Sequence, residues 1–171
     1  MKNSRNILGN HWQWVVALML LLAFPGAGLG DTYTVSTTTD GGSGSLRQAI
    51  IDANAHPGAD TISLPAGTYT LVIQGRGEDA AATGDLDISG DLAIAGAGVD
   101  TTIIDASGID RVLHVLSGTV SLSGLTVRNG SVVGSGGGIL NAGNLTLTNV
   151  KVTQNLASSG GGVFNEGGAP P

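Results

Sequence analysis

The sequence repeats nearly the same eleven residues. GSGGGILNAGN spans residues 134–144 and SSGGGVFNEGG spans residues 158–168, an offset of 24. Just before them, the apolar positions of 120–127 match those of 145–152 at an offset of 25. Repeats of this length are typical of solenoids, in which each repeat forms one turn and buries its apolar side only against neighbouring turns. The chain is therefore predicted to be a stack of turns.

Each repeat contains short strands. Apolar residues alternate with Ser, Thr, Lys or Arg, and strand side chains point alternately to opposite faces. Three strands are expected per repeat, at 120–123, 125–128 and 138–141. A leucine-rich repeat has a similar length, but its unit contains a helical or extended convex segment in place of three strands. We therefore predict an all-β fold, a right-handed parallel β-helix solenoid of about four to five coils.

The residues between strands have the character of corners. Gly136 to Gly138 allow the backbone to turn or to pack closely at the start of a strand. Asn141 and Asn165 end equivalent strands, and stacking would place their amides above one another. We expect these two asparagines to be structural, bonding up the stack and accepting a left-handed backbone conformation.

One segment before the first coil has the period of a helix. Ser45 and Gln48 have the spacing of a capping box at its start, and Pro57 follows its end. Its apolar residues form a single stripe: Leu46, Ala49, Ile50 and Ala53. A solenoid exposes an apolar cross-section at its end, which such a helix can cover. We predict that residues 31–58, a short strand and this helix, form an N-terminal cap, and that residues 59–171 form the coils.

The first thirty residues have the layout of a secretory signal peptide. Lys2 and Arg5 precede an apolar run at 14–24, and small residues follow up to Gly30. The run is shorter than the roughly 20 residues that a membrane-spanning helix needs. We predict that residues 1–30 are a cleaved signal peptide, and that the mature chain is secreted or extracellular with no membrane span.

Charge and cysteine content exclude some partners and sites. Removing Lys2 and Arg5 leaves five of the seven basic residues against 13 acidic ones, a net charge of −8. Such a surface repels phosphate backbones, so nucleic acid is not expected as a partner. The chain has no cysteine, which excludes disulfides and cysteine-ligated zinc.

Two stretches resemble a known family. GSLRQAIIDANAHPGADTISLPAGTYTL, residues 44–71, resembles the N-terminal cap of secreted bacterial β-helix proteins with the signature Cys-Ser-Leu-Arg-Glu-Ala. Here Gly44 replaces the Cys and Gln48 replaces the Glu. DTTIIDASGIDRVLHVLSG and SGLTVRNG resemble coils of the same family, which shares the pectin-lyase-like right-handed β-helix. The resemblance implies a location outside the cell or on the bacterial cell surface, and proteins that often have many more coils.

The last coil is expected to be covered on one side only. Its inward residues are predicted to be Leu145, Leu147, Val150, Val152 and Val163. Half-covering such side chains forfeits a large part of the roughly 1.5–3 kcal/mol that full burial of each supplies. We therefore expect either a truncated or fragmentary product, or self-association through this C-terminal coil.

The richest acidic cluster is a calcium candidate. Leu86 and Ile88 are expected to point inward, which puts Asp85 and Asp87 together on the outer face with Asp91 nearby. β-Helix polysaccharide lyases often use calcium to neutralise a uronate. The alternative interpretation of Asp85, Asp87 and Asp91 is a solvated acidic edge.

Other charged residues suggest no catalytic constellation. Asp110 and Arg111 are expected to form a surface ion pair, and His114 to face outward without a role. The loop of residues 75–79 is expected to be flexible. No nucleophile elbow, phosphate-binding loop or metalloprotease motif occurs in the sequence. No catalytic residue is therefore assigned.

Two functions remain open at this stage, besides a third possibility, a degraded or truncated product without a function of its own. The first is a non-enzymatic extracellular or cell-surface module, adhesin-like or structural, which binds carbohydrate or other surface ligands. The second is a carbohydrate-active β-helix, similar to a polysaccharide lyase or hydrolase, or a carbohydrate-binding wall. No cofactor is expected other than calcium.

Overall fold

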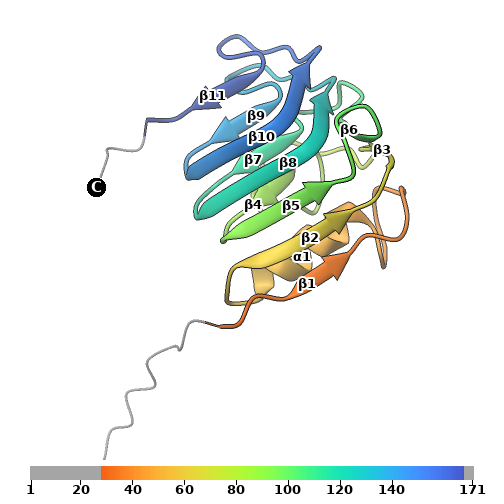
Figure 1. Cartoon of the computed structure of the whole chain (residues 1–171). Coiled ribbons are helices and arrows are strands. Elements are labelled where there is room, and N and C mark those ends of the chain that lie inside the picture. The colour runs from red at the N-terminus through yellow and green to blue at the C-terminus, as the bar shows by residue number, and fades with distance from the viewer. Residues whose placement is uncertain (1–27, 168–171) are drawn as a thin grey trace, which may run out of the picture.

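The main wall of the fold is a column of parallel strands, one from each successive turn (Figure 1). The column runs in the order β1 (Thr32–Thr34), β2 (Asp60–Leu64), β5 (Leu92–Gly96), β8 (Thr119–Arg128) and β10 (Asn144–Thr153). The computed structural model describes residues 28–167. They form a parallel β-solenoid of about five turns with one short helix, as predicted.

Two further strand columns complete each turn. One consists of β3 (Gly67–Thr70) and β6 (Thr102–Asp105), which continue onto the second halves of β8 and β10. The other is a separate four-stranded sheet of β4 (Leu86–Ile88), β7 (Leu113–Val115), β9 (Ile139–Asn141) and β11 (Val163–Asn165). The predicted strands 120–123 and 125–128 are therefore two halves of one strand, β8.

The strand register reproduces the two repeat offsets. Leu122 pairs with Leu147 at an offset of 25, and Ile139 pairs with Val163 at an offset of 24. Gly124 and its counterpart Asn149 interrupt the ladder between β8 and β10 with φ angles of 60° and 52°. A left-handed residue bends the strand there from one column to the next, and Gly and Asn tolerate that conformation.

The predicted asparagine corners are only partly correct. The side chain of Asn141 donates a 3.0 Å hydrogen bond from Nδ2 to Oδ1 of Asn165, so the two amides stack as expected. Left-handed conformations, however, fall at Asn129 and Asn149 and not at Asn141 or Asn165 within the described chain. Asn141 and Asn165 end β9 and β11 but still pair with each other in register, which keeps their backbone extended. Asn149 lies at the unpaired break in the β8–β10 ladder, and Asn129 follows the end of β8, so neither has to stay extended.

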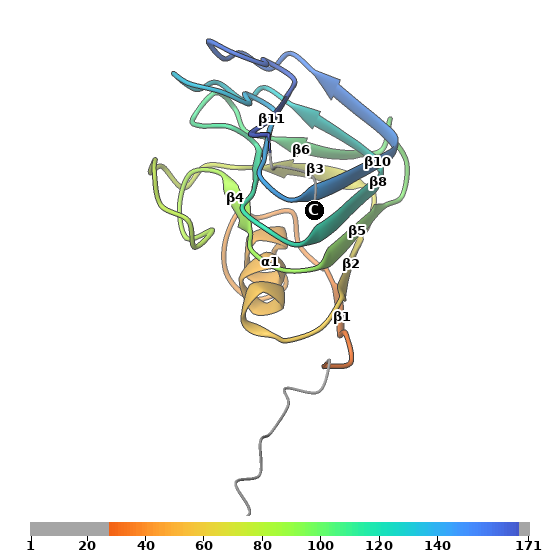
Figure 2. The same cartoon turned by 90° about the vertical axis from the view of Figure 1, so that its left-hand side faces the viewer.

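The N-terminal helix α1 (Leu46–Ala55) closes the first end of the stack (Figure 2). It packs against β1, β2 and β4 through its buried apolar stripe. Oγ of Ser45 accepts a 3.1 Å hydrogen bond from the backbone N–H of Gln48, as the cap requires. The Gln48 side chain donates to Asp52 at 2.8 Å, so its bond goes forward along the helix and not back to the cap.

The predicted signal peptide, residues 1–30, lies outside the described residues except for its last three. No helix between residues 28 and 167 is both long and apolar enough to cross a membrane.

Candidate functional site

The outer face of the β4–β7 wall carries two polar side chains directly opposite each other. Asp87 in β4 pairs in register with His114 in β7. Their strand neighbours Leu86 and Ile88 are fully buried in the core. Since side chains of a strand alternate between its faces, Asp87 and His114 both point away from the core. Both side chains were predicted to point outward, and the structure agrees.

A loop covers this part of the wall. In residues 75–84, the backbone N–H of Ala81 donates to Oδ2 of Asp87 at 2.9 Å. The carboxylate of Glu78 accepts hydrogen bonds from the backbone N–H groups of Ala80 (2.9 Å) and Thr83 (2.7 Å), which folds the loop on itself. Asp87 is therefore 0% exposed. The expectation of a solvated acidic edge is wrong for Asp87, because the loop replaces water as its partner.

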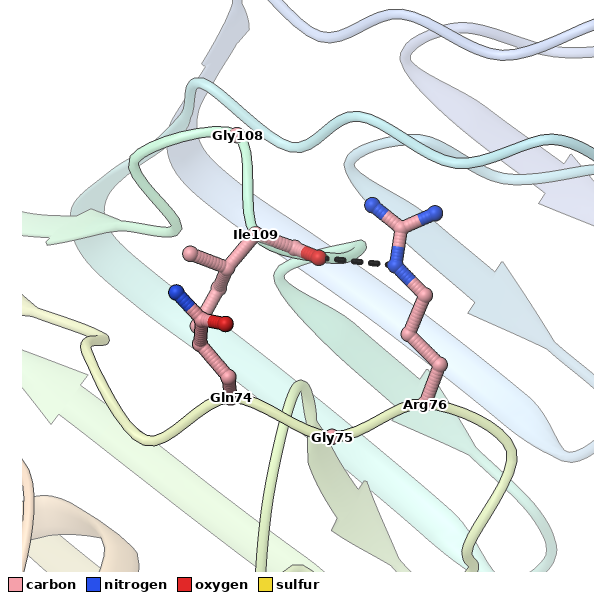
Figure 3. A pocket seen from close by; sticks show the side chains of 5 residues that line it. All are labelled: Gln74, Gly75, Arg76, Gly108 and Ile109. Carbon is pink, nitrogen blue, oxygen red and sulfur yellow. Dashed lines mark hydrogen bonds between the residues drawn. The ribbon is translucent and has the colours of Figure 1, made fainter.

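Two arginines hold the ends of the loop. Arg47 of α1 is buried, pairs with Asp40 at 2.9 Å, and donates to the backbone carbonyls of Ala81, Gly84 and Asp85. Figure 3 shows the other end, where Nε of Arg76 donates to the carbonyl of Ile109 at 2.9 Å. The segment expected to be flexible, residues 75–79, is thus bonded through Arg76 to the turn between β6 and β7, and the rest of the loop is bonded to Arg47 of α1.

The loop brings a third ligand to the pair. Nδ1 of His114 lies 3.4 Å from Oδ1 of Asp87 and 3.7 Å from Oδ1 of Asp79. All three ligand atoms lie within 4.8 Å of one another, and this is the single such group found among residues 28–167. Neither Oδ1 of Asp87 nor Nδ1 of His114 has a hydrogen-bond partner, although both atoms are buried. We call Asp79, Asp87 and His114 the Asp–His cluster.

A second group of charges lies beside the cluster. Asp85 is 2% exposed, and its Oδ2 lies 3.2 Å from Nη1 of Arg111. Burial and the neighbouring Asp87 carboxylate raise the pKa of Asp85 to about 7, against the opposing effect of the Arg111 guanidinium. The predicted Asp110–Arg111 ion pair is not formed. Asp110 instead accepts a hydrogen bond from the Arg111 backbone N–H, because stacking offers the guanidinium Asp85 on the preceding turn.

The calcium candidates are only partly brought together. Asp91 is exposed and uses Oδ1 to accept a 2.7 Å hydrogen bond from the backbone N–H of Thr119. The predicted set of Asp85, Asp87 and Asp91 therefore shares one residue, Asp87, with the Asp–His cluster.

Sequence reasoning assigned no role to His114. A signal was present, because Leu86 and Leu113 occupy equivalent positions on successive turns, which places Asp87 and His114 together one residue later. Asp79 gave no comparable signal, since it lies in a loop without any period.

Two hollows follow the outer surface next to the loop. One, of about 420 Å³, is lined by Gln74 to Arg76 and by Gly108 and Ile109 (Figure 3). The other, of about 320 Å³, shares Arg76 and is bounded by residues 131–133 and 156–158. Arg76 therefore stands between them, with its Nη2 donating to the carbonyl of Ser131 at 3.3 Å.

The last turn leaves apolar side chains uncovered. Leu147 in β10 is 38% exposed and Val163 in β11 is 37% exposed, whereas their partners Leu122 and Ile139 are fully buried. In the described part of the chain, β10 pairs only with β8, and β11 only with β9. This agrees with the expectation that the inward residues of the final coil have neighbours on one side.

Comparison with known proteins gives no relative from which a function could be carried over. The chain matches no protein-family model, no curated protein and no solved structure at a significant level. Its function must therefore be argued from the geometry described above.

Proposed function

We propose that this chain is an exported, non-enzymatic β-solenoid module that acts by contact, binding other molecules outside the cell or at a bacterial cell surface. The motifs that resemble secreted pectin-lyase-like β-helix proteins support export, as does the predicted signal peptide at 1–30. The first partner that we propose is a second copy of the chain, bound through the last turn, β10 and β11.

The uncovered last turn is the observation that carries this proposal. Its aliphatic residues continue the core column but lose their neighbours on one face, as Leu147 and Val163 show. Burial of apolar surface is worth about 25 cal/mol per Å². Within residues 28–167, β10 and β11 each pair with a strand on one side only, so a further strand could bind their other edge.

The size of the mature chain in solution tests this contact. Light scattering over a dilution series should show an associated species that dissociates on dilution. Leu147→Glu places a charge on the exposed face and should give a monomer at every concentration. Val72→Glu is the matched control, because Val72 is an exposed aliphatic residue (63%) just after β3, which β6 and β8 separate from β10 in its column, and this variant should behave as the wild type. A wild-type chain that stays monomeric throughout would contradict association through β10 and β11.

A carbohydrate-binding wall is the second candidate, and the two hollows beside Arg76 favour it over a carbohydrate-active site. The carboxylates expected to hold calcium for such an enzyme, Asp85 and Asp87, are 2% and 0% exposed, so a polysaccharide cannot reach them. The hollows are open and offer a guanidinium, an amide and backbone groups.

A glycan array probed with the folded chain, with calcium and with chelator, tests the wall. Binding should weaken in Arg76→Gln but not in Lys151→Gln, which removes an exposed positive charge on the outer side of β10. If Arg76→Gln binds glycans as strongly as Lys151→Gln does, the hollows beside Arg76 are not the carbohydrate-binding site. Loss of binding in chelator that calcium restores and zinc does not would support the calcium dependence expected from the sequence.

A further inference from the structure

We propose that the Asp–His cluster of Asp79, Asp87 and His114 binds one divalent transition-metal ion, preferably zinc, with a fourth coordination position open to solvent. This site is separate from the contact surface and from the hollows. It rests on the geometry and the unsatisfied atoms of the cluster.

The distances between the ligand atoms suit a tetrahedral ion. Zinc bonds to nitrogen and oxygen are about 2.0–2.2 Å long, which places neighbouring ligand atoms of a tetrahedron about 3.4 Å apart. Nδ1 of His114 is 3.4 Å from Oδ1 of Asp87 and 3.7 Å from Oδ1 of Asp79. The two carboxylates offer ligand atoms no more than 4.8 Å apart, so one ion can reach both carboxylates and the imidazole once the exposed Asp79 side chain adjusts to it.

Two buried atoms of the cluster lack a hydrogen-bond partner, and they support metal binding independently of the distances. Nearly all buried polar atoms in proteins have a hydrogen-bond partner, so an orphaned pair facing each other needs an explanation. Oδ1 of Asp87 and Nδ1 of His114 are such a pair, and Asp87 is 0% exposed. Its Oδ2 is already held by the Ala81 backbone N–H, which fixes the direction in which Oδ1 points. An ion between Oδ1 and Nδ1 would satisfy both atoms.

The donor set selects the type of metal. Two carboxylates balance the charge of a divalent cation, and a neutral imidazole supplies the third bond. Calcium takes six to eight oxygen ligands, whereas a histidine nitrogen with two carboxylate oxygens suits zinc and its neighbours in the first transition row. Three protein ligands leave one position for water, which the exposed side of Asp79 admits.

The site has a rigid half and an adjustable half. Asp87 and His114 stand on paired strands of two successive turns, so their separation is set by the sheet. The side chain of Asp79 is 69% exposed and belongs to the loop of residues 75–84. Metal binding would therefore add a further attachment of this loop, besides those made by Arg47, by Arg76 and by the Ala81 backbone N–H.

Zinc competition with a chromophoric chelator tests the site in the full chain after treatment with EDTA. The wild type should take up one zinc ion at this site, and added calcium should not displace it. Asp79→Asn should weaken binding by at least about tenfold, since even an outer-shell partner of a metal ligand is worth about 10–100-fold in affinity. Asp100→Asn, which removes an equal charge from an exposed position, should bind as the wild type.

A second test compares variants of two histidines, His114 and His56. It keeps the proposal testable if the loop rearranges in Asp79→Asn. With cobalt in place of zinc, the wild type should show the intense visible absorption of a tetrahedral site. His114→Gln should abolish this absorption, and His56→Gln should leave it unchanged. Zinc should also raise the thermal midpoint of the wild type but not of His114→Gln. Absence of zinc binding in the wild type, or binding as strong as the wild type in both Asp79→Asn and His114→Gln, would overturn the proposal.

Discussion

At the scale of single residues, two buried aspartates of the coils, Asp85 and Asp105, have an arginine partner on the following turn. Asp105 in β6 is bound by Nε of Arg128 at 2.8 Å and by Nδ2 of Asn129 at 3.0 Å, both from the following turn. Burial alone would raise the pKa of Asp105, but hydrogen bonds from the Ser107 backbone, Asn129 and Arg128 outweigh it and hold the pKa below its usual range.

Asp105 therefore makes a pH-dependent contribution to stability. Its pKa is lowered by folding, so the unfolded chain takes up the proton first, and the contribution is present above about pH 4 and lost at lower pH. Asp105→Asn should lower the free energy of unfolding by about 1–3 kcal/mol at pH 7, as expected for hydrogen bonds to a charged group. The deficit relative to the wild type should shrink as the pH falls from 5 to 3.

Urea unfolding of both proteins across this pH range measures the deficit. The exposed Asp100→Asn should show little deficit at any pH. A deficit for Asp105→Asn that stays constant from pH 7 to pH 3 would mean that the carboxylate charge is not what stabilises the fold.

At the scale of elements, the helix cap depends on one half of the predicted capping box. The Ser45 side chain satisfies a backbone N–H that the first turn of a helix otherwise leaves without a partner. The Gln48 side chain is turned toward Asp52 and adds no bond to the cap. The two residues, equivalent in the sequence motif, are therefore unequal in the structure.

Alanine substitutions should reveal this inequality. Ser45→Ala should destabilise the fold by about 1 kcal/mol, the usual cost of losing an N-cap. Gln48→Ala should cost no more than about 0.5 kcal/mol, because it removes one side-chain pair along the helix. Chemical denaturation of both variants gives the comparison, and equal losses would show that Gln48 does close the cap in solution.

The elements also show how far the sequence determines the site. Alternation predicted that Leu86 and Ile88 point inward and that Asp87 and His114 point outward, because period 2 is a property of the strand itself. The covering of Asp87 by the loop of 75–84 could not be predicted, since that segment has no period to align. The Asp85–Arg111 pair was missed for a related reason: partners in a solenoid are adjacent in space but a full turn apart in the chain.

At the scale of the whole molecule, the core is a column whose burial depends on position along the stack. Ile62, Ile94 and Leu122 occupy equivalent places on successive turns and are at most 1% exposed. Leu147 continues the column on the last turn and is 38% exposed. The same type of side chain should therefore contribute differently in the middle and at the end.

Truncating two stacked leucines measures this difference. Leu122→Ala should lower the free energy of unfolding by about 2–5 kcal/mol, as for other buried leucines. Leu147→Ala should cost no more than about half as much, because its site is open on one face and water can fill the space. Both unfolding free energies should be measured at low protein concentration, where the proposed self-association is absent. Equal costs there would indicate that Leu147 is covered in solution.

The helix α1 and its buried Arg47 close the N-terminal end of the stack of turns among residues 28–167. Each turn offers the following turn a strand edge for hydrogen bonding and a layer of aliphatic side chains for packing. These two features fix the register of the next strand. Folding can thus proceed turn by turn from the N-terminal side, with each folded turn as the template for the next. A chain built in this way can gain or lose layers at its far end during evolution without redesign of its foundation.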